Sequence, residues 1–165
     1  MDFKILKQDG PARIGQINID TQKINSPNIL FIDTKRIRSP VFFEIILANE
    51  KKQNKKPQII YKENYEDFFD YENNLLELDQ KNIFVLKFAK QIFRNPCKFA
   101  SEIIEIRKKI GPEKILYTPA LADPSNLSIL TYLGIDLFDS TSAIVSARNG
   151  KLFFPNGSIH KNELK

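Results

Sequence analysis

The stretch Gly134–Gly150, GIDLFDSTSAIVSARNG, joins a short apolar run to an acid, then to small residues, and ends in Arg148-Asn149-Gly150. Leu137 and Phe138 are predicted to form a short strand buried on both faces, because the run is apolar. Asp139 then stands at the carboxyl end of that strand. The functional loops of α/β proteins follow such strand ends, so the stretch predicts a carboxylate at the mouth of a sheet.

Apolar runs of the same form recur along the chain and alternate with helical patterns. These runs are Ile29–Ile32, Ile59–Tyr61, Ile83–Leu86 and Ile115–Tyr117. Asn95-Pro96 and Asp123-Pro124 each offer a capping side chain followed by proline, which favours the start of a helix. Gly111 and Gly134 are expected to end these two helices. The first helix carries one apolar stripe, formed by Phe99, Ile103, Ile106 and Ile110.

The order of these elements predicts the fold class. Short buried strands joined by helices imply parallel pairing with right-handed crossovers, so we expect an α/β fold. Phe3–Leu6 and Ala12–Ile19, separated by Asp9-Gly10-Pro11, predict an N-terminal β-hairpin. A length of 165 residues without an internal repeat or low-complexity linker predicts one domain, residues 1–165.

Composition restricts the classes of function. One cysteine, Cys97, cannot form an internal disulfide, and one histidine, His160, cannot build a His/Cys metal site within this chain, so we expect no metal. The sequence contains neither a membrane-spanning run nor a signal-peptide pattern, and we expect a cytoplasmic protein that makes no membrane contact. The net charge of +5 suits a polyanionic partner without requiring one.

Two carboxylates are candidates for chemistry, and each has a structural alternative. Asp139 could serve as a nucleophile, base or hydrogen-bond acceptor, or it could be the N-cap of a helix that begins near Ser142. Asp33 ends the first of the apolar runs and could act as a second carboxylate or as a turn residue. Asp136 could equally cap or form a salt bridge. No glycine-rich phosphate loop supports a generic phosphate-binding domain.

Residues 134–154 and 157–159 resemble the tRNA-guanine transglycosylases, which carry Gly-Ile/Val-Asp-hydrophobic-Phe-Asp, then Arg-Asn-Gly, then a short hairpin. Residues 9–15, DGPARIG, and 26–34, SPNILFIDT, are similar to that family's opening hairpin and first barrel strand. Residues 117–127, YTPALADPSNL, are closer to one branch of the family, the archaeosine synthases. The chain thus resembles an archaeosine synthase N-terminal domain.

The resemblance implies roles for individual residues. Asp139 matches the transglycosylase nucleophile; in the synthase branch, which adds lysine to the nitrile of a 7-deazaguanine already in tRNA, it would hold the base or assist proton transfer. Asp33 is the second candidate catalytic residue. Base-binding roles are expected for Pro119, Ala120, Ser140 and Thr141, and tRNA-binding roles for Arg148 and Asn149.

The chain also departs from the family pattern. It lacks the segment with the second catalytic aspartate, Val145 replaces a tRNA-contacting arginine, and residues 40–93 match poorly. No zinc motif or PUA-type RNA-binding tail is present. Because a full (β/α)₈ barrel usually needs about 200 to 250 residues, we expect a shortened TIM-barrel-like domain or an open α/β sheet.

The sequence therefore favours one function and keeps one alternative. The favoured hypothesis is one piece of a split archaeosine synthase, a tRNA-modifying transferase active with a partner that supplies the zinc and RNA-binding modules. The alternative is a non-catalytic subunit that binds tRNA or scaffolds a catalytic partner. In both cases an incomplete barrel predicts association with another polypeptide or with a second copy of the chain.

Overall fold

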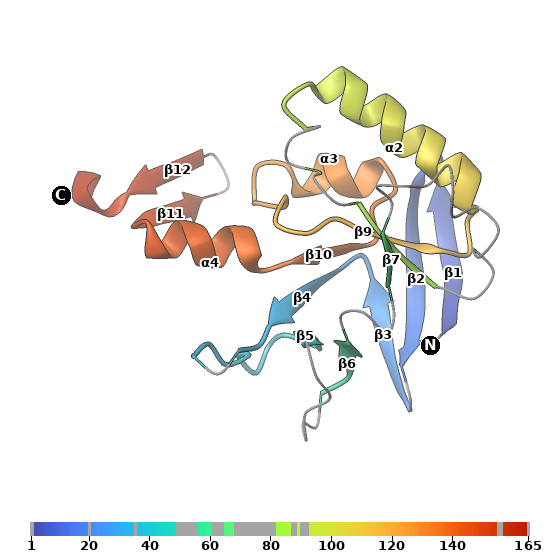
Figure 1. The fold of residues 1–165 in the computed structure, drawn as a ribbon, viewed down its shortest axis with the longest axis horizontal. Coiled ribbons are helices and arrows are strands. Elements are labelled where there is room, and N and C mark those ends of the chain that lie inside the picture. The colour runs from blue at the N-terminus through green and yellow to red at the C-terminus, as the bar shows by residue number, and fades with distance from the viewer. Residues whose placement is uncertain are drawn as a thin grey trace.

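A computed structural model describes residues 2–19, 21–34, 36–48, 56–60, 65–67, 82–86, 89, 93–154 and 157–164. Figure 1 shows a sheet with helices on one side, a separate N-terminal antiparallel sheet, and a C-terminal extension. No helix within these ranges is long and apolar enough to cross a membrane.

The N-terminal sheet contains three antiparallel strands in the order β1-β2-β3. They are β1 (Asp2–Asp9), β2 (Ala12–Ile19) and β3 (Gln22–Ser26). The expected hairpin is confirmed, and its turn contains Gly10 at a φ of 57°, a conformation that favours glycine. The third strand was not predicted.

The main sheet contains seven strands, and every pairing in it is parallel. Its strands are β4 (Asn28–Ile32), β5 (Ile45–Ala48), β6 (Gln58–Ile60), β7 (Tyr65–Asp67), β8 (Ile83–Val85), β9 (Ile115–Tyr117) and β10 (Leu137–Asp139). The five expected strands and their parallel pairing are confirmed, although Tyr61, the last residue expected in one of them, lies outside the described residues. Strands β5 and β7 were not predicted.

The strand order has the character of an opened barrel. The order is β6-β5-β4-β10-β9-β8-β7, so strands that follow one another in sequence lie side by side, except β6 and β7. The last strand, β10, pairs with the first, β4. Within the described residues no pairing joins β6 to β7. This is the strand order of a βα-barrel that is open between two neighbouring strands, so the fold is compatible with a partial barrel.

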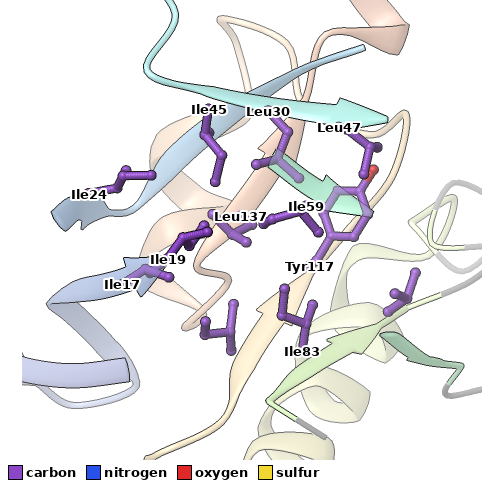
Figure 2. Packing of buried hydrophobic residues seen from close by; sticks show 12 residues of the cluster. Ile17, Ile19, Ile24, Leu30, Ile45, Leu47, Ile59, Ile83, Tyr117 and Leu137 are labelled. Carbon is purple, nitrogen blue, oxygen red and sulfur yellow. The ribbon is translucent and has the colours of Figure 1, made fainter. Parts of the chain in front are cut away.

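One face of the main sheet encloses an apolar interior. Figure 2 shows Leu30 and Leu47 of β4 and β5 on the opposite side of the cluster from Ile83 of β8, with the Tyr117 ring of β9 between them, as expected of a curled sheet. Residues of β2 and β3 complete the cluster at one end; these are Ile17, Ile19 and Ile24. The N-terminal sheet therefore plugs the interior.

The opposite face of the sheet packs on helices. Helix α2 (Pro96–Ile110) begins with Asn95, whose side chain accepts a hydrogen bond from the Lys98 amide, and ends at Gly111 with a φ of 78°. The predicted start, end and buried stripe of this helix are confirmed. The stripe packs with Phe84, Leu116 and Phe138 on the sheet.

The predicted start of the second helix is wrong. Helix α3 (Leu127–Tyr132) begins after Asn126, three residues beyond the expected proline. The Asp123 carboxylate accepts hydrogen bonds from the amide (2.8 Å) and hydroxyl (2.5 Å) of Ser125, so it stabilises a turn rather than a helix terminus. Gly134 follows this helix as expected, with a φ of 91° and the Pro11 carbonyl oxygen only 2.6 Å from where a Cβ would lie.

A buried ion-pair cluster joins the N-terminal sheet to the main sheet at the amino end of β10. Asp136 accepts from Arg13 at 2.7 and 2.5 Å, from Arg107 at 2.9 Å, and from the Leu116 amide at 2.7 Å. Burial lowers the pKa of Arg107 to about 10, although the Asp136 charge opposes that change. Asp136 thus forms a salt bridge, one of the two roles its position allowed.

The C-terminal extension is a helix followed by a hairpin. It contains α4 (Thr141–Arg148), β11 (Lys151–Phe154), β12 (Gly157–His160) and η2 (Lys161–Glu163), which we call the C-terminal arm. Figure 1 shows α4 continuing beyond the end of β10 rather than turning back along the sheet. No side chain of α4 is buried.

Candidate functional site

Asp139 lies at the carboxyl end of β10, and its carboxylate is held by three donors. Its Oδ2 accepts a hydrogen bond from the Tyr117 hydroxyl, and its Oδ1 accepts one from the Thr141 amide at 2.8 Å. The Ala120 amide lies 3.2 Å from both oxygens. Because Asp139 is only 5% exposed, these donors replace water around the charge.

Asp139 contacts the first turn of helix α4 without occupying its N-cap position. Helix α4 begins at Thr141, so Ser140 occupies the N-cap position and makes no side-chain capping bond. Asp139 stands one residue earlier, yet its carboxylate satisfies the first amide of the helix. The expectation that Asp139 itself is the N-cap of a helix near Ser142 is therefore wrong.

Tyr117 contacts the candidate site residue Asp139 and was not predicted from the sequence. Its ring is 1% exposed and belongs to the interior cluster shown in Figure 2, while its hydroxyl reaches Asp139 at the mouth of the sheet. The available signal was its position, since Tyr117 is the last residue of β9 and its neighbour β10 ends in Asp139. A phenol at such a strand end joins an apolar interior to a polar site.

Pro119 and Ala120, both predicted base-binding residues, form the loop that follows β9. Ala120 has a φ of 56°, the only positive value at a non-glycine residue in the described parts of the chain. An alanine in this conformation costs about 1–2 kcal/mol, and such strain is common at functional sites. The strained conformation directs the Ala120 amide at Asp139.

Ser140 and Asp33 follow the paired strands β10 and β4 at the same edge of the sheet. The Ser140 amide donates to the Leu30 carbonyl at 3.1 Å, and its hydroxyl accepts from the Ile32 amide at 3.1 Å. Asp33, the next residue, is 7% exposed, and its Oδ2 lies 3.9 Å from the exposed guanidinium of Arg38. Both predicted site residues therefore lie at the same edge of the sheet as Asp139.

The predicted tRNA contacts lie apart from this edge. Arg148 is in the last turn of α4 and is exposed, and Asn149 follows it with its carbonyl 3.0 Å from Nε2 of His160. The eight residues of α4 span about 12 Å, which separates these residues from Thr141 and Asp139. The structure thus places the predicted base-binding residues at the carboxyl edge of the sheet and the predicted tRNA contacts at the far end of α4.

No group of three or more His, Cys, Asp or Glu side chains in the described ranges is arranged to hold a metal ion. Cys97 is exposed at the start of α2, and His160 belongs to the C-terminal arm. The chemistry available at the carboxyl end of β10 is that of the buried Asp139 carboxylate, with a phenol and two backbone amides as hydrogen-bond donors.

Replacing Tyr117 by phenylalanine is expected to lower the free energy of unfolding by about 1–3 kcal/mol, because a buried carboxylate loses one donor. Urea denaturation of the Tyr117→Phe variant measures this change. Tyr132→Phe is the matched control, since that tyrosine is 62% exposed on α3, and it should unfold like the parent. Equal stability of both variants would show that the Tyr117 hydroxyl contributes nothing.

Three curated proteins are similar to part of this chain, while no family model matches it. Archaeosine synthase subunit alpha of Methanosarcina acetivorans is 30% identical over 88 residues, which is 53% of this chain and 14% of that protein. Archaeosine synthase of Methanocaldococcus jannaschii is 29% identical over 86 residues, or 52% of this chain and 15% of that protein. Archaeosine synthase subunit alpha of Thermoplasma acidophilum is 28% identical over 83 residues.

The matched segments cover 50–53% of this chain but only 14–16% of the three relatives. The similarity therefore supports a relationship to one part of much longer proteins. About half of the chain is therefore similar in sequence to three proteins named archaeosine synthase or its alpha subunit.

Proposed function

We propose that this chain is a transglycosylase-like part of an archaeosine synthase and acts on a 7-deazaguanine base within tRNA. Three relatives with that name support the proposal, at 28–30% identity. The observation that carries it is the Asp139 carboxylate, which is held at the carboxyl end of a parallel strand, the usual position of active sites in βα-barrels.

The base would lie over the loop ends beside Asp139. Ala120, Ser140 and Thr141 have small side chains, which lets a flat ring approach the backbone there. In the proposed reaction the lysine amine adds to the nitrile carbon, a proton passes from the amine to the nitrile nitrogen, and the glycosidic bond stays intact. Asp139 would accept a hydrogen bond from the base or carry that proton.

The proposal includes a second polypeptide. Two of the relatives are named as an alpha subunit, which suits an enzyme made of more than one chain. The proposed partner would carry zinc-binding and RNA-binding modules, and the tRNA would contact both chains. Arg148 and Asn149 are the proposed tRNA contacts on this chain.

One observation favours the second candidate, a non-catalytic tRNA-binding or scaffolding subunit. Both oxygens of Asp139 already accept hydrogen bonds from the protein, and the residue is 5% exposed. A nucleophile or base needs a free lone pair within reach of the substrate. Catalysis would therefore require that the hydrogen bond from the Ala120 amide or from the Tyr117 hydroxyl to Asp139 breaks when the base binds.

Binding of tRNA is expected to weaken steeply with salt, because each neutralised phosphate releases counterions. Arg148→Ala should reduce the slope of log affinity against log salt by about one. Filter binding of unmodified tRNA over a range of salt concentrations measures both quantities. Lys108→Ala is the control, since that exposed cation lies in the last turn of α2, outside the proposed interface, and it should leave the slope unchanged.

The function itself is tested by mass spectrometry of nucleosides from tRNA incubated with the chain, its partner and lysine. Lysine-dependent formation of the modified nucleoside is the expected result. Salt-dependent tRNA binding without any requirement for this chain in nucleoside formation would favour the scaffolding subunit. An unchanged salt slope in Arg148→Ala would remove Arg148 from the interface.

A further inference from the structure

A groove of about 650 Å³ lies on the outer wall of the sheet where β4 meets β10. Ile29 and Phe138 from these two strands line it, Leu127 and Thr131 of α3 line it further, and Phe42 adds an aromatic ring that is 78% exposed. Apolar surface of this kind in a soluble protein commonly marks an interaction site.

The groove corresponds to the place of a helix that follows the last strand of a barrel. In a βα unit that helix turns back and packs on the outer face of the sheet, through a connection of about 2–6 residues. Here only Ser140 separates β10 from α4. Because hydrogen bonds to Leu30 and Ile32 fix Ser140, α4 cannot reverse and leaves the body instead.

The C-terminal arm therefore carries exposed apolar side chains that do not pack on the main sheet of the same chain. Val145 on α4 is 49% exposed, and Leu152 and Phe154 on β11 are 41% and 48% exposed. The exposed charges along the arm are mainly basic, with Arg148 and Lys151 among them, whereas the charged residue that lines the groove is Glu44. The two surfaces are thus complementary in both hydrophobicity and charge.

We propose that the groove receives the C-terminal arm of a second copy of this chain. Reciprocal exchange gives a dimer with twofold symmetry, in which α4 of each copy covers the β4–β10 junction of the other. A short connection that prevents packing within one chain is a known cause of such exchange. The inference goes beyond the proposed function, because the dimer forms or fails irrespective of tRNA.

Sedimentation equilibrium of the full chain tests the proposal. The expected species has twice the mass of one chain and dissociates on dilution. Phe42→Glu in the groove and Val145→Glu on the arm should each give monomers, with circular dichroism unchanged because both side chains are exposed. Ile129→Glu is the matched control, since this residue is 61% exposed on α3 and does not line the groove; it should remain dimeric.

Cross-linking identifies the occupant of the groove. In a Cys97→Ser background, one tagged copy carries Val145→Cys and a differently tagged copy carries Phe42→Cys. A short bismaleimide should link the two different copies. A monomer at every concentration would overturn the proposal, and so would a dimer that survives Phe42→Glu or that gives no link between tagged copies.

Discussion

Asp139→Asn is expected to reduce tRNA modification by the reconstituted complex by on the order of a hundredfold, while the fold survives. An amide cannot serve as a carboxylate base or nucleophile, which accounts for the loss. Asparagine can direct its oxygen at the amides of Thr141 and Ala120 and donate its NH₂ group to the Tyr117 oxygen. The free energy of unfolding should therefore change by only about 1 kcal/mol.

The measurement is the rate of nucleoside formation, with urea denaturation of the same samples to verify the fold. Asp123→Asn is the control, because the Asp123 carboxylate stabilises a turn through Ser125 and should be dispensable for the reaction. Parent-like activity in Asp139→Asn would mean that this carboxylate only organises the start of α4. The non-catalytic subunit would then be the better description of the chain.

Asp136→Ala is expected to have the largest effect on stability, a loss of about 3–5 kcal/mol in the free energy of unfolding. The substitution leaves the buried guanidinium groups of Arg13 and Arg107 without their counter-ion and leaves the Leu116 amide without its acceptor. Since domains of this size are stable by only about 5–15 kcal/mol, thermal and urea unfolding should both shift strongly.

Glu102→Ala provides the comparison for that prediction. Glu102 forms an ion pair with Lys98 at 3.7 Å, but the side chain of Lys98 is 67% exposed and that of Glu102 is 38% exposed. Such surface pairs contribute at most about 1 kcal/mol, so this variant should unfold close to the parent. If Asp136→Ala cost no more than Glu102→Ala, the cluster would not hold the N-terminal sheet in place.

Uniform apolar runs allowed prediction of the parallel strands, because a strand buried on both faces leaves that simple signature. The missed strand β5 lies in Val41–Ala48, where one glutamate interrupts a longer apolar run. Periodicity cannot distinguish helix from strand in such a segment. The prediction of where α3 starts was wrong for a different reason. The Asp123 carboxylate accepts hydrogen bonds within a turn, from Ser125, and therefore does not cap a helix.

At the site, the position of Asp139 could be predicted because it depends on local features, a strand followed by small residues. Its partners could not be predicted in the same way. Tyr117 lies 22 positions earlier in the chain, and only the pairing of β9 with β10 brings the two side chains together. The conformation of Ala120 likewise depends on the hydrogen bonds that its amide makes to that distant carboxylate.

The pairing of β4 with β10 also has a consequence for how the chain folds. The junction includes the hydrogen bond from the Ile32 amide to the Ser140 hydroxyl, and these two residues are 108 positions apart in the chain. Forming this junction requires closure of a long loop before any contact offsets the lost chain entropy. Strands β4–β6 and β7–β10 can each assemble from nearer neighbours, so their union is expected to be the late, slow step that sets the refolding rate.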